Sequence, residues 1–480
     1  MHSKCHRPNE KMGNDFVKLF PKNDLTTNVT IEGCNLCVAP NIYFRPANSK
    51  NQMNILILGS GGREHALAWK ITQSPHCTQL FIAPGNGGTL QYGTNLNFGV
   101  NDFAALKQCC LDKVINMVVV GPEDPLVNGV YDFVVNDEAL KSIIVVGPSK
   151  QAAQLEGSKA FSKKFMERHH IPTAAYKEFT SDNFAEGKAY LQQHKLPIVL
   201  KADGLAAGKG VVICQSHEEA LRVFNEMIIN KQFGEASSKV VVEQFLDGIE
   251  ISVFALTDGK DYKIIGHAKD YKRIGHADTG PNTGGMGCVS PVPFAGEVFM
   301  QKVIGSIIEP TIAGLHKEKF TYKGFVFFGL IKVGEEPFVI EYNCRLGDPE
   351  TEVVLPRLQN DLIELFLQMH HGTLGDAKIS YDERAAVTVM AVSGGYPGVY
   401  EKGKGIYFPE GEDKKEDVLV FHAGTTFDHG HGLVTNGGRV ITATALRSTI
   451  SEAAAAAKDT ISEIEFEGKY YRTDIGYEFE

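Results

Sequence analysis

The sequence predicts an α/β protein that begins with a parallel sheet and ends in a β-rich unit, and three observations lead to this prediction. Between residues 53 and 150, short apolar runs alternate with amphipathic stretches. Glycine-rich turns follow several of those runs, and glycine makes up 49 of the 480 residues. After residue 385 the apolar runs are mostly of the β type. Short buried β runs separated by helices are typical of a parallel sheet with helices on its faces.

Residues 53–150 account for the parallel sheet. Met53 opens a sharp apolar run, Ile55–Leu58, after a polar stretch that lacks a clean period. Strands are predicted at 54–58, 79–83, 116–120 and 143–146, and helices at 62–73, 103–112 and 127–139. Ligands bind to such sheets beyond the carboxyl ends of the strands, so the turns after these runs are candidate binding loops.

The remaining elements follow in order along the chain. Residues 151–194 are rich in predicted helix, and Pro172 disfavours helix for the residue before it. Between 196 and 255, strands are predicted, one of them at 239–245, with a helix at 217–229. Residues 262–350 are predicted to contain a long glycine-rich loop, a helix at 296–316 and strands at 324–333 and 337–342. The remaining predictions are a helix at 359–370, strands at 385–392, 418–422 and 439–446, and a last helix at 449–461.

Composition excludes several classes of protein. The formal charge of −10 argues against a nucleic-acid coat protein, which usually carries a basic excess. A 43% apolar and 22% charged chain is not disordered throughout. There is no uncharged apolar run of about 18 residues, and the first residues lack the apolar core of a secretory signal. Nine sparse cysteines indicate a reducing cytoplasm, and the isolated Cys34-x-x-Cys37 pair is interpreted as incidental.

The first glycine-rich turn, Gly59–His65, follows a strand and opens a helix. Glycines permit the tight turn, and the amides at a helix start attract an anion. NAD is disfavoured because Glu64 stands where the third glycine of a dinucleotide fingerprint would fall, and because the second strand ends without an acid. A different phosphorylated ligand and a tight turn without ligand remain open. Two further turns at strand ends, Gly121–Leu126 and Gly147–Ser149, favour the ligand.

The stretch Lys201–Val211 is the most informative part of the sequence. It is small, glycine-rich and cationic, with Lys209 near its other end, and it lies between two apolar strands. A triphosphate needs neutralisation and close approach of the backbone, and this loop offers both. It is not a P-loop, because Gly210 stands where Ser or Thr is required and because it joins strand to strand. The alternative is a mobile hairpin without ligand.

Two later segments suit a nucleotide and a metal ion. Backbone groups at 244–246 could pair with an adenine edge, and Glu250 could accept hydrogen bonds from ribose hydroxyls. On a strand, Glu341, Asn343 and Arg345 would share one face. Glutamate and asparagine oxygens suit Mg²⁺, and an arginine stabilises charge on a transferring phosphoryl group. Without a ligand, these segments would be an acidic turn and a polar strand face.

Together these segments resemble the ATP-grasp ligases and, within them, the phosphoribosylamine–glycine ligase family. The resemblance extends from Met53 to near the C-terminus, and residues 1–52 have no counterpart in it. The motifs that carry it are Gly59-Ser-Gly-Gly-Arg-Glu-His-Ala66, Ala83-Pro-Gly-Asn86, Gly121-Pro-Glu123, Gln154-Leu-Glu-Gly-Ser-Lys159, Lys201–Val211, Glu243–Glu250, Asp278–Gly287, Asn343–Glu350, Phe421–Thr425 and Val434–Arg439.

The resemblance implies a domain organisation. It consists of a Rossmann-like pre-ATP-grasp domain at 53–155, an ATP-grasp domain at 156–375 with a mobile subdomain at about 173–246, and a C-terminal β-rich domain at 376–480. Residues 1–52 form an extension, which is either a flexible segment or the product of a wrongly chosen upstream start codon.

The resemblance also implies a reaction of de novo purine biosynthesis. ATP and glycine would give glycyl phosphate, which the amine of 5-phosphoribosylamine would attack to form glycinamide ribonucleotide, with ADP and phosphate as the other products. The implied cofactors are ATP and Mg²⁺ or Mn²⁺. The expected partners are small molecules, without nucleic acid or membrane, and we expect a cytoplasmic monomer or weak homo-oligomer.

Roles for individual residues follow from the same resemblance. It implies ATP binding by Lys159, Lys201, Gly208, Lys209, Gly210, Glu243, Gln244, Phe245, Leu246 and Glu250, metal binding by Glu341 and Asn343, and catalytic roles for Arg345, Asp348 and Asp270. It implies substrate binding by Gly61, Gly62, Arg63, Pro122, Glu123, Lys272, Arg273, Thr283 and Gly284. Many ATP-grasp enzymes have a second metal carboxylate upstream, where this chain has Gly329. We therefore expect Glu341, Asn343 and the phosphates to hold the metal alone.

Three other interpretations compete with this one. The nearest is another ATP-grasp ligase that joins a different carboxylate and amine. A nicotinamide-dependent dehydrogenase would bind NAD in a calorimeter. A non-catalytic nucleotide sensor is disfavoured because Lys201, Glu341, Asn343 and Arg345 are all present.

Overall fold

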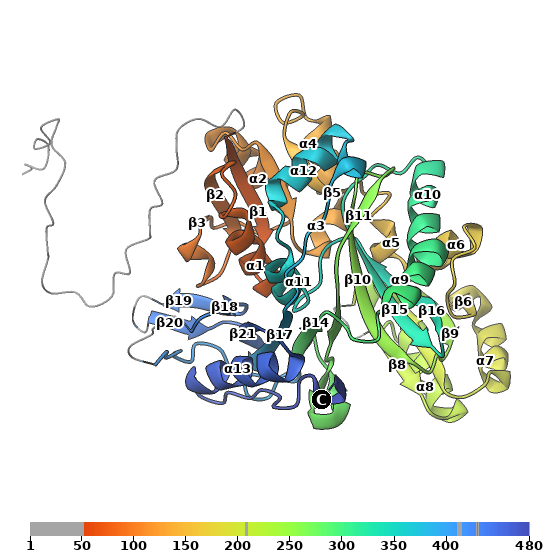
Figure 1. Cartoon of the computed structure of the whole chain (residues 1–480). Coiled ribbons are helices and arrows are strands. Elements are labelled where there is room, and N and C mark those ends of the chain that lie inside the picture. The colour runs from red at the N-terminus through yellow and green to blue at the C-terminus, as the bar shows by residue number, and fades with distance from the viewer. Residues whose placement is uncertain (1–51, 207–209, 410–414, 429, 431, 480) are drawn as a thin grey trace, which may run out of the picture. The chain divides into compact units, whose positions relative to one another are not determined.

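A computed structural model describes the chain from Gln52 to Phe479, except for residues 207–209, 410–414, 429 and 431 (Figure 1). The predictions for residues 1–51, including Cys34 and Cys37, and those for Gly208 and Lys209 lie outside the described residues. All described residues belong to one unit, Arg45–Glu480.

The first strands form the predicted parallel sheet. Strands β1 (Met53–Gly59), β2 (Cys77–Pro84), β3 (Thr94–Asn95), β4 (Met117–Val120) and β5 (Ile144–Pro148) pair in parallel in the order β3-β2-β1-β4-β5. Alternating residues of these strands belong to two apolar cores, one on each face. The strand order reverses between β1 and β4, which is the position where ligands bind to open α/β sheets.

The helices of this region are α1 (Gly62–Ile71), α2 (Phe103–Asp112), α3 (Glu123–Asn128) and α4 (Val130–Asn136). The first two confirm the predicted helices. The single helix predicted at 127–139 is wrong, because the chain breaks between α3 and α4. Gly129, with φ of 95°, ends α3 in the left-handed conformation, which interrupts a helix and which glycine adopts without steric strain.

A four-stranded antiparallel sheet follows, with the order β6-β9-β7-β8. The elements of this region are α5 (Gln154–Gly157), α6 (Lys159–Arg168), β6 (Tyr176–Thr180), α7 (Phe184–Gln193), β7 (Ile198–Ala202), β8 (Val211–Cys214), α8 (His217–Ile228) and β9 (Lys239–Gln244). Residues of α7 and α8 pack on the sheet in a core of their own. Lys201 pairs with Val211, so the glycine-rich loop joins two antiparallel strands, as predicted.

Further strands extend the first sheet. They are β10 (Ile249–Thr257), β11 (Tyr262–Asp270), β14 (Gly287–Ser290), β15 (Tyr322–Val333) and β16 (Glu336–Asn343), and β15 meets β5 through Tyr322 and Pro148. The stretch after residue 262 is therefore more than the predicted loop. It contains β11, a separate hairpin of β12 (Arg273–Gly275) and β13 (Thr279–Asn282), and β14. The four residues of β13 are all exposed, so apolar alternation does not mark them as a strand.

The predicted helix at 296–316 is confirmed as α9 (Glu297–Val303) and α10 (Glu309–Lys317), joined by the π-helical turn Ile304–Ile308. By length and composition alone, Glu297–Lys317 could cross a membrane. Its side chains at Val303, Ile307, Ile308, Ile312 and Leu315 instead belong to the same core as β15 and β16. This packing is typical of a core helix.

The C-terminal strands continue the large sheet. This part comprises α11 (Thr351–Arg357), α12 (Leu362–His371), β17 (Ala385–Val392), β18 (Val418–His422), β19 (Thr425–Asp428), β20 (Gly432–Thr435), β21 (Arg439–Arg447) and α13 (Ile450–Glu463). Strand β17 pairs with β14 on one side and β21 on the other, and α13 packs on β17 and β21 (Figure 1). The short hairpin β19–β20 was not predicted from the sequence, since each strand has only four residues.

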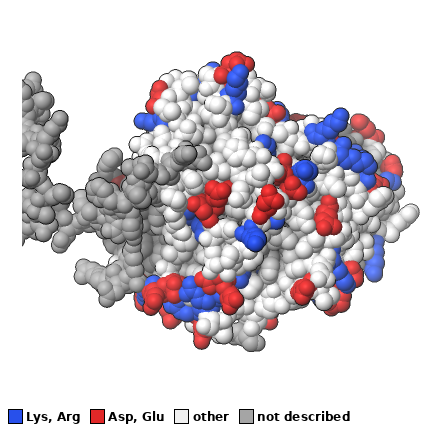
Figure 2. Space-filling model, turned by 45° about the horizontal axis from the view of Figure 1, so that its top comes forward, with Lys and Arg blue, Asp and Glu red and all other residues white. Residues whose placement is uncertain are grey.

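The surface shown in Figure 2 carries charges of both signs. Lysine and arginine side chains are intermixed with aspartate and glutamate side chains over this face. This distribution accords with the modest net charge of −10.

Candidate active site

A cavity of about 720 Å³ lies at the carboxyl ends of β1 and β2, where the C-terminal strands approach them. Turns that follow strands make up most of its wall, as the parallel sheet predicts. Its lining consists of Ser60–Gly61, Pro84–Gly87, Asn95–Asn97, Ala423–Phe427 and Asn436–Arg439, with Leu90, Asp348 and Tyr396.

The first turn of α1 borders this cavity, and carboxylates bind two of its amides. The N–H of Gly61 donates to Glu64 in a capping box, and the N–H of Arg63 donates to Asp348 Oδ2 at 3.2 Å. Carboxylates are stabilised at a helix N-terminus for the same reason as phosphates. The sequence predicts that this turn binds an anion. At these two amides, the anion is a carboxylate of the protein itself.

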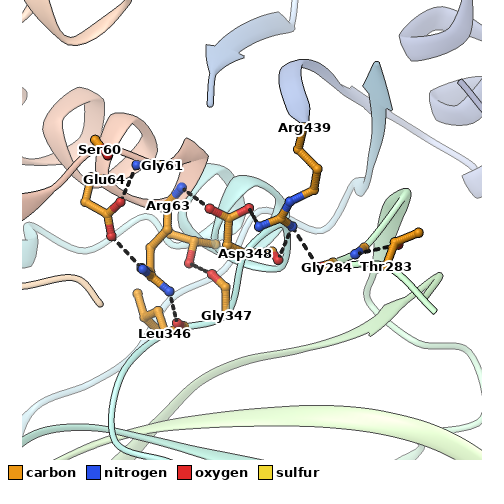
Figure 3. A network of polar contacts seen from close by, with 12 residues as sticks. Ser60, Gly61, Arg63, Glu64, Thr283, Gly284, Leu346, Gly347, Asp348 and Arg439 are labelled. Atoms are coloured by element: carbon orange, nitrogen blue, oxygen red, sulfur yellow. Dashed lines mark hydrogen bonds and ion pairs between the residues drawn. The ribbon is translucent and has the colours of Figure 1, made fainter. Parts of the chain in front are cut away.

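Asp348 lies between α1 and Arg439 (Figure 3). Arg439 Nη2 is 3.0 Å from Asp348 Oδ1, and Arg439 Nη1 donates to the carbonyls of Asp348 and Gly284 at 2.5 and 2.7 Å. Burial raises the pKa of Asp348. The positive charges of Arg439 and Arg63 lower it by more, so the net pKa is below the usual range. Asp348 is therefore ionised at neutral pH.

Arg345 is held between two carboxylates. Its Nη2 is 2.8 Å from Glu156 Oε1, and its Nε is 3.3 Å from Glu123 Oε2. Burial raises the pKa of Glu156 to about 7, although Arg345 opposes the rise. Burial also raises the pKa of Glu123, but Arg345 and Arg63 reverse this, so its net pKa is lowered. The guanidinium keeps its charge, because the two glutamates raise the pKa of Arg345 against the effect of burial.

Arg345 also links the cavity to the end of β16. The strand ends at Asn343, so the prediction that Arg345 shares a strand face with Glu341 and Asn343 is wrong. The chain turns after Asn343, and Arg345 Nη2 folds back to donate to Asn343 Oδ1 at 3.2 Å. The carbonyl of Leu346 accepts from Nη1 of both Arg345 and Arg63, at 3.2 Å each.

Two lysines meet one glutamate where the glycine-rich loop begins at Lys201. Glu243 Oε2 is 2.9 Å from Lys201 Nζ and 3.3 Å from Lys163 Nζ, and all three side chains are buried. Lys201 also donates to the carbonyl of Ile340, and Lys163 to Thr173 Oγ1. Burial lowers the pKa of Lys163 to about 8, while Glu243 opposes the decrease. Among the described residues, no group pairs with the buried Glu243 Oε1, so an acceptor is available for a ligand.

Lys159 lies at the start of α6, beside the same loop. Its Nζ donates to the carbonyl of Gly204 at 3.1 Å, and Asp203 accepts from Ser158 and from the N–H of Ala160. Burial lowers the pKa of Lys159, although Glu341 opposes this change. Glu341, the predicted metal ligand, therefore lies close enough to Lys159 to stabilise its charge.

The link between β9 and β10 contains residues that the sequence predicts to contact an adenine. The N–H of Gln244 donates to the carbonyl of Ala175, and Phe245 and Leu246 are half-buried in the link. Glu250, at the start of β10, forms an ion pair with Lys272, which is also 3.8 Å from Asp270. Lys272 lowers the pKa of Glu250, and burial raises the pKa of Asp270.

Glu341 and Asn343 are the oxygen-bearing side chains at the end of β16. Gly329 pairs with Glu341 on the neighbouring strand, so this position offers no second carboxylate to a metal ion. A Cβ at Gly329 would lie 3.1 Å from Glu341 Cγ. The described residues contain no group of three His, Cys, Asp or Glu suited to a metal ion. Two protein oxygens with ligand phosphates fit Mg²⁺, which keeps few protein ligands.

The structure separates the predicted substrate residues into two groups. Gly61 lines the cavity, Gly62 and Arg63 lie behind it in α1, and Pro122 precedes Glu123 at the start of α3, near Arg345. Lys272, Arg273 and Thr283 flank or belong to the β12–β13 hairpin, and Gly284 contacts Arg439. Gly210 is buried at the end of the glycine-rich loop, where its carbonyl accepts from the N–H of Ala202.

Sequence reasoning assigned no role to four residues that the structure brings to these sites. They are Glu156, Lys163, Arg439 and Asn86, whose side-chain amide donates to the carbonyls of Ser60 and His422. Three of them belong to motifs that carry the family resemblance, which could have identified them. Lys163 had no such signal, because a lysine on an amphipathic helix is usually exposed.

Comparison with known families assigns most of the described chain to one family. Residues 53–156 match the phosphoribosylglycinamide synthetase N domain, residues 157–351 its ATP-grasp (A) domain and residues 386–478 its C domain. The phosphoribosylamine–glycine ligase of Vibrio cholerae is 46% identical over 431 residues, which cover 88% of this chain and 98% of that protein.

Solved structures agree with the family match. The crystal structure of phosphoribosylamine–glycine ligase from Thermotoga maritima has 35% identity and a TM-score of 0.75, and the match covers 88% of this chain and 99% of that one. A biotin carboxylase domain from Hydrogenobacter thermophilus has a TM-score of 0.66 at 16% identity, with 88% and 93% covered, and shows a shared fold only. The predicted α/β fold with ATP-grasp relatives is confirmed.

Proposed function

This chain belongs to the phosphoribosylglycinamide synthetase family and ligates glycine to phosphoribosylamine in purine biosynthesis, and we propose that the reaction proceeds through glycyl phosphate. The observation that carries this proposal is that one short segment, Asn343–Asp348, links the predicted metal ligand Asn343 to the cavity. Arg345 donates to Asn343 Oδ1 at one end of this segment, and Asp348 lines the cavity at the other. Phosphoryl transfer on one side and amine attack on the other can therefore share one activated carboxylate.

The first step activates glycine. A carboxylate is a poor electrophile, so a glycine oxygen attacks the γ-phosphorus of ATP, the bond to the bridging oxygen breaks, and ADP leaves. Negative charge develops on the phosphoryl oxygens, and the ionised Arg345 guanidinium, held by Glu123 and Glu156, is oriented to stabilise it. Because two carboxylates fix its position, little reorganisation is needed when the charge develops.

The second step forms the amide bond. The amine nitrogen of phosphoribosylamine attacks the acyl carbon, and phosphate leaves as the carbon–oxygen bond breaks. We propose that the amine substrate occupies the 720 Å³ cavity, with Asp348 and Arg439 at its inner end. Holding amine and acyl phosphate in contact supplies up to about 7–11 kcal/mol of the barrier reduction in favourable cases. Exclusion of water would protect the acyl phosphate.

The reaction uses ATP and a divalent metal ion. We propose that Lys159 and Lys201 bind the phosphates, that Glu243–Leu246 borders the adenine, and that Glu250 binds the ribose. The free Glu243 Oε1 supports this, because a buried acceptor without a donor is unfavourable until a ligand supplies one. Glu341 and Asn343 would hold Mg²⁺ or Mn²⁺, and the bound metal would neutralise phosphate charge.

We also propose a cytoplasmic location and a monomer or weak homo-oligomer. Buried thiols at Cys109, Cys214 and Cys344 are the arrangement expected in a reducing compartment.

Release of ADP by the purified protein tests the function. The assay contains MgATP, glycine and freshly generated phosphoribosylamine, and each substrate is omitted in turn. We expect ADP release to require both glycine and phosphoribosylamine for sustained turnover. A rapid-quench trace with acid-labile phosphate on glycine would support the acyl phosphate. ADP release that needs neither substrate, or no release at all, would overturn the proposal.

A further inference from the structure

Arg472 is an arginine near the end of the described chain, and its side chain is 0% exposed. Its Nη1 donates to the carbonyl of Arg273 at 3.2 Å and to Asp278 Oδ1 at 2.6 Å. Its Nε and Nη2 donate to the two oxygens of Asp474, both at 2.8 Å. Burial of a guanidinium is unfavourable unless its N–H groups are paired. Here the pairing joins the C-terminal segment to the first residue of β12 and to the tip of the 273–282 hairpin (β12–β13).

Other residues of the C-terminal segment Tyr470–Glu478 contact the same region. Tyr470 Oη donates to the carbonyl of Ile274 at 2.9 Å, and Tyr477 Oη donates to Asp278 Oδ2 at 3.3 Å. Just before the hairpin, Tyr271 Oη donates to Glu478 Oε2 at 2.6 Å. Contacts thus come from the start, middle and end of the segment.

The hairpin has a strained tip. Ala277 and Asp278 have φ of 49° and 53°, a left-handed conformation that is unfavourable for a non-glycine residue. Such residues persist where their surroundings over-determine them. The N–H of Ala277 donates to Asp474 Oδ2 at 2.8 Å, and Asp278 binds Arg472, so the C-terminal segment supplies those contacts.

The hairpin connects the two sides of the active site. Lys272, directly before β12, pairs with Glu250 and lies near Asp270 on the nucleotide side. Thr283, directly after β13, donates through its N–H and its Oγ1 to the carbonyl of Lys272, which closes the hairpin base. Gly284 follows, and its carbonyl accepts from Arg439 in the cavity wall. A shift of the hairpin would therefore move groups on both sides.

We infer that the segment Tyr470–Glu478 positions the 273–282 hairpin for the ligation reaction, with Arg472 as its central positioning residue. The inference rests on the proposed function, since it concerns how the acyl phosphate is protected and presented to the amine. Arg472 itself does not touch substrate; it acts through the hairpin and through the groups at the hairpin's two ends.

The test compares Arg472→Lys with the matched control Glu467→Gln, which removes an ion pair to Lys404 on the surface of the same C-terminal region. Lysine keeps the charge but lacks the planar fork that binds Asp474 and Asp278 together. For Arg472→Lys we expect the KM for glycine or phosphoribosylamine to rise about tenfold, the size expected for loss of one charge-assisted hydrogen bond. We also expect ADP release to exceed product formation, and faster amide exchange within 273–282. The control should behave as wild type.

The possible outcomes separate this inference from the proposed function. Wild-type protein without ligase activity would reject the function. An active wild type, with Arg472→Lys showing unchanged KM and unchanged coupling despite faster exchange of the hairpin, would reject the positioning role. If Arg472→Lys does not fold, Asp474→Asn and Tyr477→Phe remove fewer contacts and should show the same changes to a smaller extent. Unchanged kinetics in both of these folded variants would equally overturn the inference.

Discussion

The nucleotide side and the cavity side of this active site are built differently. On the nucleotide side, charged side chains on strands and helices pair with one another, as in the cluster of Glu243 with Lys163 and Lys201. On the cavity side, the wall is mostly backbone and small side chains from five separate stretches of chain, and Arg439 is the only Lys or Arg among the described residues that line it. On the proposed assignment, the difference teaches that charged side chains would bind the ATP phosphates on one side, while shape and hydrogen bonding would hold the amine substrate on the other.

The two sides also meet at a single segment. Between Asn343 and Asp348, the chain passes from the metal pair to the cavity, and Arg345 lies between them. A substitution at one side should therefore affect mainly its own ligand, unless it disturbs this segment. Substitutions made on one side at a time test that separation.

The largest effect is expected at the metal pair. Glu341→Ala should lower the rate of ADP formation by at least about a thousandfold with the fold retained, because a metal ion stabilises the transition state by several kcal/mol. Steady-state ADP release, circular dichroism and Mn²⁺ binding in the presence of ADP would measure this. Glu336→Ala, at the other end of β16, is the matched control. Full activity of Glu341→Ala would contradict the metal assignment.

The next effect is expected in the cavity. Arg439→Lys should lower kcat/KM for phosphoribosylamine by about a hundredfold, since one ammonium cannot reproduce the guanidinium's contacts with Asp348 and Gly284. The KM for ATP should stay close to that of wild type. Arg447 is the last residue of the same strand, and its guanidinium also donates to carbonyls. As the control, Arg447→Lys should have little effect. An equal loss of ATP affinity in Arg439→Lys would show that the two sides are not separate.

A smaller effect concerns the acid stability of the protein and involves His422, a buried residue next to the cavity wall. Burial lowers the pKa of His422 to about 4, whereas an unfolded histidine titrates near about 6.5. As the pH falls from 6.5 to 4, the unfolded state binds the proton first, so the free energy of unfolding decreases. His422→Gln should abolish on the order of 2 kcal/mol of this decrease. Denaturant unfolding at pH 7 and pH 4.5 would measure it, with the exposed His316→Gln as control. The same pH dependence in both variants would refute the assignment.

The smallest effect is expected at alkaline pH on the nucleotide side. The pKa of Lys163 is about 8 in the folded protein, and an unfolded lysine titrates near about 10.4. Between these values the unfolded state binds more protons, so this group makes the free energy of unfolding rise with pH. Lys163→Met should remove a rise of about 2 kcal/mol between pH 8 and 10. The neighbouring Lys164→Met, an exposed ion pair with Glu178, is the control. If the free energy of unfolding rose more steeply with pH in Lys163→Met than in wild type, Lys163 would have the opposite effect and this explanation would be excluded.

Much of the fold could be predicted from local patterns. The strands of the parallel sheet are continuous apolar runs, so β1, β2, β4 and β5 were found within a few residues. The hairpin around the glycine-rich loop was predicted because apolar runs bound it on both sides. The elements that sequence reasoning missed lack such patterns. Strand β13 is fully exposed, and the break between α3 and α4 depends on a single glycine.

The sequence by itself determined the chemistry of this protein, because motifs such as Lys201–Val211 and Asn343–Glu350 keep charged groups at fixed short spacings. Only the tertiary structure decided which distant groups meet. Arg439 reaches Asp348 across 91 residues, and Arg472 reaches Asp278 across 194. No local pattern encodes such contacts, since they depend on how β14 and β17 pair and carry the C-terminal strands to the cavity. Side-chain spacing is a property of the chain, whereas a cavity wall is a property of the packed sheet.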